Sequence, residues 1–171
     1  MTAGPMTRPT PGERLLFVAR TVLAEVDLLR ITDARLLALP MDAERAASLR
    51  TDVDLAERVD AFVARFGRLQ DTAGDKLLPA VLAWMAEPVG PAIDNLARAE
   101  RFGWIESATD WLRWRQLRNF MIHEYVDDAR QLAEALTKGH EAVDALCKAG
   151  HGLTALVLGE AADSTPQPAA T

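Results

Sequence analysis

The chain of 171 residues has a single cysteine, Cys147, so an intrachain disulfide is impossible. Such low cysteine content is typical of proteins in a reducing compartment. No apolar run is long enough to span a membrane, and the apolar run nearest the N-terminus ends at Arg20, too soon for a signal peptide. We therefore expect a cytoplasmic protein without a membrane partner.

An excess of positive charge is also absent. The chain has 19 Lys and Arg residues against 25 Asp and Glu residues, which gives a net charge of −6. This balance argues against a protein that coats nucleic acid, because Lys and Arg drive phosphate binding. It leaves open an enzyme with a local basic pocket, and it would suit a basic partner protein.

Two further kinds of motif are missing. The chain has no glycine-rich phosphate loop and no acidic pair of the nucleotidyltransferase kind, so it is not expected to transfer nucleotides itself. No group of His, Cys or carboxylate residues has metal-ligand spacing. We therefore expect neither a cofactor nor a metal.

The residues that are present favour helix. Hydrophobic residues make up 49% of the chain, and Leu, Ala, Arg, Asp and Glu dominate. We expect an all-α, up-and-down bundle of about five helices. Residues 12–158 should form this domain, between a flexible arm at 1–11 and a disordered tail at 159–171.

Caps and breakers place the individual helices. The first should end before Pro40, and the second should kink near Pro79. The apolar face of that second helix has steps of three and four residues, at Phe62, Phe66, Leu69, Ala73 and Leu77. The expected helices are 11–39, 52–85, 90–103, one from 107, and one from about 127 to 149 or 158, with 42–50 a short helix or a linker.

The fourth expected helix carries the segment Arg118-Asn119-Phe120-Met121-Ile122-His123-Glu124-Tyr125. A histidine can move a proton at neutral pH, and an arginine can hold a phosphate. The two residues together are therefore suited to acting on a phosphodiester.

This segment resembles the Arg-x4-His-x-Tyr signature of the HEPN family (higher eukaryotes and prokaryotes nucleotide-binding). Within the family it is most similar to the ribonuclease toxins that are paired with a minimal nucleotidyltransferase antitoxin. The stretch 62–71 is similar to the second-helix sequence of the family. The helical bundle expected from the residues agrees with the HEPN fold.

The resemblance implies a metal-independent endoribonuclease. His123 would be the general base toward an RNA 2′-hydroxyl, and Arg118 would hold the phosphate. Asn119 would orient His123 or donate to the phosphate. It also implies that the antitoxin adenylylates Tyr125, which would add charge and bulk beside the site. Simpler roles are a surface or helix-end histidine for His123 and an interface phenol for Tyr125.

Each residue of a helix advances by about 100°, which sorts the fourth helix into faces. Trp114, Leu117, Phe120 and Met121 fall together as the core face. The polar residues Arg115, Arg118, Asn119 and His123 fall opposite. A straight helix leaves Arg118 and His123 roughly 140° apart, a problem that a site shared between protomers would resolve.

Two apolar residues, Trp111 and Ile122, fall within the polar face and suggest that it packs against something. In the HEPN family that is the same helix of a second copy, so we expect a homodimer with Trp111 and Ile122 at its interface. Further phosphate contacts are possible at Arg115, Arg65 and Arg68. For the last of these, an ion pair with Asp71 is the simpler interpretation.

Three functions remain open from the sequence. The first is the RNA-cleaving toxin. The second is a non-catalytic HEPN module, which would bind nucleotide or act as the scaffold subunit of a nucleotidyltransferase complex. The third is a helical interaction protein in which the motif is incidental. The intact Arg118, His123 and Tyr125 favour the enzyme, whereas the acidic net charge favours the module.

Overall fold

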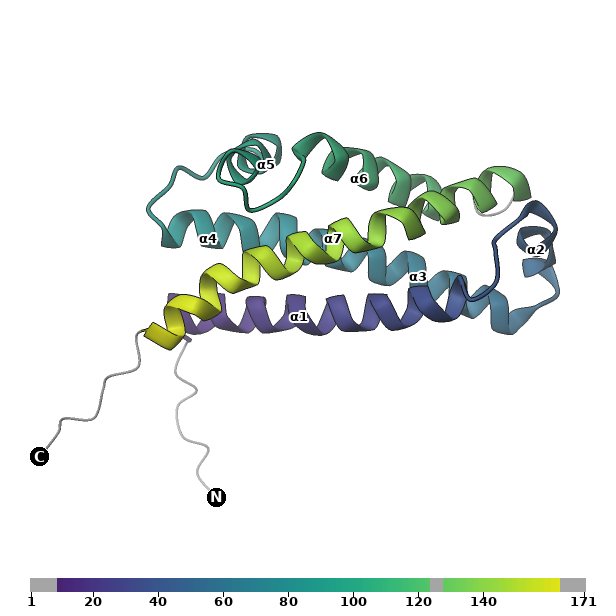
Figure 1. Cartoon of the computed structure of the whole chain (residues 1–171), viewed down its shortest axis with the longest axis horizontal. Helices are drawn as coiled ribbons and strands as arrows, with labels where there is room; N and C mark the ends of the chain where they lie inside the picture. The colour runs from purple at the N-terminus through teal and green to yellow at the C-terminus, as the bar shows by residue number, and fades with distance from the viewer. Residues whose placement is uncertain (1–8, 124–127, 164–171) are drawn as a thin grey trace, which may run out of the picture.

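The computed structural model describes residues 9–123 and 128–163, and every regular element in these two stretches is helical (Figure 1). The predicted all-α bundle is confirmed. The elements are α1 (Pro11–Leu36), α2 (Ala43–Ala47), the 3₁₀ turn η1 (Ser48–Arg50), α3 (Val53–Gln70), the π-helix η2 (Asp71–Leu77), α4 (Leu78–Trp84), α5 (Ala92–Arg101), α6 (Ala108–His123) and α7 (Ala129–Asp163).

Four long rods make the bundle: α1, the continuous run from α3 through η2 to α4, α6 and α7 (Figure 1). Successive rods run in opposite directions, so α1 begins and α7 ends at the same end of the molecule. The first rod, α1, packs against α3 and α7, while α6 packs against α7 and α3. Both α3 and α7 therefore contact α1 as well as α6.

Polar side chains cap the helix starts that the sequence predicts. Thr10 and Glu13 form a capping box at α1. Ser107 Oγ accepts from the Asp110 backbone N–H at 3.0 Å, which starts α6. Asp128 Oδ1 accepts from the backbone N–H of Gln131 at 3.1 Å, which starts α7.

Two helix ends differ from the prediction. The first helix stops at Leu36 instead of 39, because Arg45 donates to the carbonyl oxygens of Leu36 (2.9 Å) and Leu39 (2.6 Å) and holds the chain in a turn. The last helix, α7, continues to Asp163, five residues into the predicted tail. The next proline is only at position 166, so nothing earlier breaks the helix. Residues 1–8 and 164–171 of the predicted arm and tail lie outside the described residues.

Near Pro79, where the sequence predicts a kink, the structure has the π-helix η2. Proline has no N–H to donate to the carbonyl four residues earlier, here that of Asp75. The wider turns of η2 end at Leu77, two residues before this proline, and accommodate the missing hydrogen bond. The predicted core face is confirmed, since Phe62, Phe66, Leu69, Ala73 and Leu77 are all fully buried.

Candidate functional site

One stripe of α6 lies against α3 and η2 and carries part of the predicted motif. It consists of Trp111, Arg115, Arg118 and Ile122, at steps of four, three and four residues. Two glycines on the facing helices allow close approach. A Cβ at Gly74 would lie 2.9 Å from the Trp111 ring, and one at Gly67 would lie 2.5 Å from Arg118 Cδ. The stripe that we expected to face outward is therefore an internal contact along much of its length.

The prediction that Trp111 lies at a dimer interface is wrong. Its side chain is only 1% exposed and fills space between α6 and η2 within one protomer. The sequence placed Trp111 correctly on one stripe with Arg115 and Arg118, but the charges of those arginines suggested that the whole stripe faces solvent. Ile122, at the end of the same stripe, is 52% exposed.

The Arg118 side chain is held between α6 and α3 and is only 19% exposed. Its Nη1 donates to Asp71 Oδ1 at 2.6 Å, and its Nη2 donates to Asn119 Oδ1 at 3.4 Å. A guanidinium has five N–H donors in a planar fork. Asp71 therefore fixes the orientation of the fork while other donors remain for an anion.

Arg115 makes a similar contact one turn earlier. Its Nη2 donates to Asp75 Oδ1 at 2.7 Å, and its side chain is 25% exposed. The prediction that Arg115 and Arg118 point away from the bundle is thus incorrect. Both arginines extend to carboxylates of η2. The contact between the helices removes part of the water around each guanidinium group, and an unpaired cation there would be costly.

A groove of about 400 Å³ opens between α3, η2 and α6 beside Arg118. Its charged lining consists of three cations, Arg68, Lys76 and Arg118, and one carboxylate, Asp71. The local excess of positive charge contrasts with the net charge of −6 for the chain. Apolar and small residues complete the lining, namely Val63, Ala64, Gly67, Thr72 and Ile122. The groove is suited to an anion that carries an apolar or ring-shaped part.

An acidic residue of α1 borders this groove. Glu25 Oε1 accepts from the hydroxyl of Thr72 at 3.1 Å. Burial raises the pKa of the Glu25 carboxyl, and the hydrogen bond from Thr72 acts in the opposite direction. The positive charges of Arg68 and Lys76 also lower this pKa. Glu25 is therefore close enough to the groove to interact electrostatically with its cations.

The structure separates the other predicted phosphate contacts. Arg68 lines the groove together with Arg118, and Asp71 pairs with Arg118 instead of with Arg68. Arg65 turns toward α1, where it donates to Thr32 Oγ1 and to the Leu28 carbonyl at 3.3 Å. Arg65 therefore does not share a pocket with Arg118.

The second half of the motif is at the end of α6. Asn119 is exposed, and Met121 is fully buried near Gly139 of α7. His123 is the last residue of α6. The side chain of His123, and Tyr125 with its neighbours 124–127, lie outside the described residues.

Comparisons with protein-family models, with curated proteins and with solved structures give no match to this chain. In residues 9–123 and 128–163, no helix is both long and apolar enough to cross a membrane. Within the same ranges, no three His, Cys, Asp or Glu side chains are grouped so that they could hold a metal ion.

Sequence reasoning missed the residues of α3 and η2 that complete the groove. Gly67 and Gly74 are seven residues apart, which is two turns along one face. This spacing was the available signal that another helix approaches closely there. Nothing in the sequence indicated that Asp71, 47 residues away, is the partner of Arg118.

The position of Arg118 is predicted to depend on the lack of a side chain at Gly67. In Gly67→Ala, a methyl group would lie 2.5 Å from Arg118 Cδ and would displace the guanidinium from Asp71. The matched control is Gly159→Ala on α7, where a Cβ meets nothing within 4 Å. We expect Gly67→Ala to be less stable than Gly159→Ala by about 1–3 kcal/mol in urea unfolding. Equal stabilities would show that Arg118 moves aside without cost.

Proposed function

We propose that this chain is a HEPN-type endoribonuclease, the toxin of a pair whose antitoxin is a minimal nucleotidyltransferase. The main support is the placement of Arg118. It lies in a groove with Arg68 and Lys76, on the same helix that ends at His123. A fixed cation, a basic groove and a histidine on one helix supply what RNA transesterification requires.

The reaction needs one proton removed and one negative charge stabilised. Neutral His123 takes the proton of a 2′-hydroxyl, and that oxygen attacks the adjacent phosphorus. The bond from phosphorus to the 5′-oxygen breaks, the leaving 5′-oxygen takes a proton from water, and His123 returns its proton to the solvent. The products are a 2′,3′-cyclic phosphate and a 5′-hydroxyl. Arg118 stabilises the charge that develops on the phosphoryl oxygens.

Asp71 prepares Arg118 for this role. The hydrogen bond of 2.6 Å between them fixes the fork in a partly buried position, so little reorientation is needed when a phosphate arrives. The amide oxygen of the exposed Asn119 accepts from Arg118. In the proposed reaction, Asn119 donates to the phosphate or orients His123. Because no step uses a metal, cleavage is expected to continue in its absence.

Tyr125 is the proposed point of control. The partner nucleotidyltransferase transfers AMP to its hydroxyl, and the new phosphate competes with RNA for Arg118. Tyr125 is the only tyrosine in the chain. It follows His123 after a single intervening residue, so a modification there also adds bulk next to the proposed base.

A homodimer that pairs two α6 helices belongs to the same proposal. Ile122 remains as its apolar contact, since it is 52% exposed and lines the groove beside Arg118. Pairing through Ile122 would bring two copies of the motif to one cleft. It would also bring His123 of one copy near Arg118 of the other, which a single straight helix keeps apart.

One observation favours the second function, a non-catalytic module. Arg118 and Arg115 each contact a carboxylate of their own chain, at 2.6 Å and 2.7 Å. An incoming phosphate must share these cations with Asp71 and Asp75. If Asp71 and Asp75 keep the two arginines and exclude the phosphate, the groove would hold a neutral partner surface instead of RNA. The chain would then be a scaffold.

The deciding experiment is cleavage of RNA by purified, unmodified protein in EDTA. We expect fragments with 2′,3′-cyclic phosphate ends, because Arg118 and His123 suffice for transesterification. End-group analysis by mass spectrometry identifies the product. Activity that disappears on chelation, or fragments with 3′-hydroxyl ends, would rule out this mechanism. Protein that binds RNA oligonucleotides without cleaving them would favour the non-catalytic module.

A further inference from the structure

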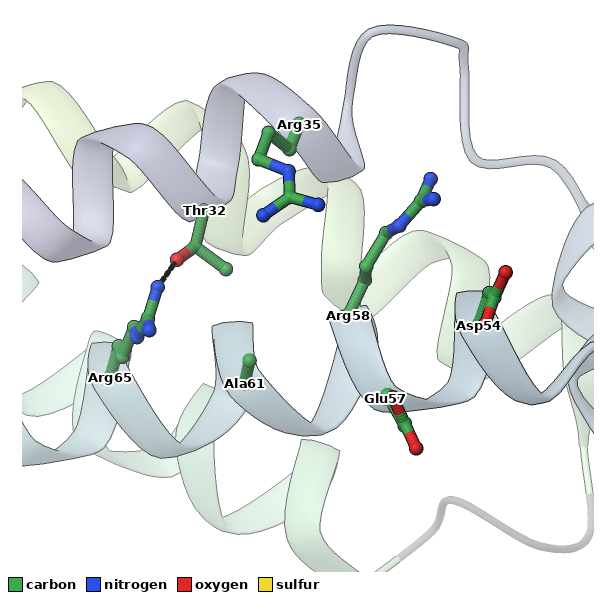
Figure 2. A pocket seen from close by; sticks show the side chains of 7 residues that line it. All are labelled: Thr32, Arg35, Asp54, Glu57, Arg58, Ala61 and Arg65. Atoms are coloured by element: carbon green, nitrogen blue, oxygen red, sulfur yellow. Dashed lines mark hydrogen bonds between the residues drawn. The ribbon is translucent and has the colours of Figure 1, made fainter.

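A second basic hollow lies between α1 and α3 (Figure 2). Its volume is about 360 Å³. Three arginines line it, Arg35 from α1 and Arg58 and Arg65 from α3, together with Thr32, Asp54, Glu57 and Ala61. The proposed reaction of Arg118 and His123 does not involve this hollow.

Two of the three arginines have no partner among the described residues. Arg65 is anchored by Thr32 and by the Leu28 carbonyl. Arg35 and Arg58 are exposed, and neither forms an ion pair or hydrogen bond within the two described stretches. In Figure 2, Arg35 reaches from α1 toward α3, and Arg58 rises from α3 on the side of α1. The positive charges of Arg35 and Arg58 thus lie at one hollow, and neither is paired with a carboxylate of the described residues.

The acidic residues nearby do not neutralise the hollow. Glu57 points away from Arg35 and Arg58 in Figure 2, and Asp54 lies at the end beyond Arg58. Because like charges repel, an anion placed between the guanidinium groups would be attracted by all of them. The planar fork of arginine matches the oxygens of a phosphate group.

The same helix lines both basic hollows. Arg68 of α3 belongs to the groove beside Arg118, while Arg58 and Arg65 belong to the second hollow. Arg58 and Arg68 are ten residues apart, which corresponds to about 15 Å along a helix. Ala61 lines the second hollow and Ala64 lines the groove, so each of the two has a short side chain of α3 in its wall. A strand of a few nucleotides is long enough to reach from one hollow to the other.

We propose that the hollow of Arg35, Arg58 and Arg65 binds a backbone phosphate of the RNA strand, a few nucleotides from the phosphate held by Arg118. This proposal rests on the proposed ribonuclease function. It assigns the hollow to substrate binding alone, since it lies outside the reacting groups. It would also explain how an acidic chain holds RNA, through two local cation clusters that both include arginines of α3.

The test compares the double variant Arg35→Gln/Arg58→Gln with a charge-matched control, Arg20→Gln/Arg130→Gln. All four arginines are exposed, and the control pair lines neither of the two hollows. The binding probe is a fluorescent single-stranded DNA of ten nucleotides, which lacks the 2′-hydroxyl and resists cleavage. We expect the test variant to bind it about tenfold or more weakly than the control. The slope of log affinity against log salt should become shallower by about 0.7 for each phosphate that the variant no longer neutralises.

Substrate length separates a binding role from a structural one. A diribonucleotide has one phosphate and cannot span both hollows, so its cleavage should be the same in the test and control variants. For a ten-nucleotide RNA, the test variant should raise KM about tenfold and leave kcat within about twofold.

Three outcomes would overturn parts of the proposal, and they are distinguishable. Test and control variants with equal affinity and equal salt slope would refute the phosphate site, whatever the cleavage result. Equal losses on the diribonucleotide and the long RNA would refute it in favour of a structural role. Wild-type protein that binds DNA through Arg35 and Arg58 but never cleaves RNA would refute the ribonuclease and leave a phosphate-binding hollow.

Discussion

His123→Ala is expected to lower the rate of RNA cleavage by about 10²–10⁴-fold, the usual loss when a general acid–base group is removed. In the proposed mechanism, His123 is the only group that removes the proton of the 2′-hydroxyl. The rate is measured in single-turnover cleavage of a fluorescent RNA, and growth arrest on induction gives a second readout. Circular dichroism establishes that the variant is folded.

The control for this loss is His151→Ala. His151 is an exposed residue of α7 and lies far along the chain from the motif. Its replacement should leave the rate unchanged. Added imidazole should partly restore His123→Ala, because a small base can enter the space that the truncation leaves. A His123→Ala variant that still halts growth and cleaves at the wild-type rate would remove His123 from the mechanism.

Arg118→Lys extends the same test to the phosphate contact. Lysine keeps the positive charge but loses the planar fork that bonds to Asp71 and to a phosphate at once. The cleavage rate of Arg118→Lys should therefore be as low as that of Arg118→Ala, although lysine preserves the charge. Single-turnover cleavage of the same fluorescent RNA measures both variants, and a wild-type rate for Arg118→Lys would show that charge alone is enough.

Trp111→Ala is expected to destabilise the protein by about 3–5 kcal/mol, the usual cost of truncating a buried tryptophan. The ring is 1% exposed and packs on Gly74 of η2. A domain of this kind has a total stability of about 5–15 kcal/mol, so much of it would be lost. Urea unfolding followed by circular dichroism measures the change.

The matched variant is Trp111→Phe. The indole Nε1 is buried and has no hydrogen-bond partner among the residues that the structure describes, so its removal breaks no hydrogen bond there. Phenylalanine keeps most of the ring volume, and the loss of stability should be clearly smaller than for alanine. If Trp111→Ala kept its stability and only changed the oligomeric state, Trp111 would be an interface residue after all.

Much of the fold could be predicted because its signals are local. The core face of α3 follows from apolar residues at steps of three and four, and the starts of α6 and α7 follow from Ser107 and Asp128 as caps. These signals act within about one or two helical turns. They do not depend on what the rest of the chain does.

The environment of α6 could not be predicted in this way. Its apolar residues are distributed around the helix, so periodicity grouped Trp111, Arg115 and Arg118 correctly but could not say which way the group faces. The facing surface consists of Gly67 and Gly74, whose missing side chains make room for an arginine stem and an indole ring. The polarity of Arg115 and Arg118 alone suggested that this face of α6 is exposed to solvent. The glycines and carboxylates of the neighbouring helix instead make it an internal contact.

The sequence by itself determined the helical class, most helix boundaries, the apolar face of α3 and the motif that suggests RNA cleavage. Only the tertiary structure decided the partners of the charged groups. Asp71 pairs with Arg118 across 47 residues and leaves Arg68 in the groove, and Arg65 turns to α1. The physical reason is that a helix face is fixed by its own periodicity, while the choice among nearby opposite charges depends on which side chains come within about 3 Å of each other.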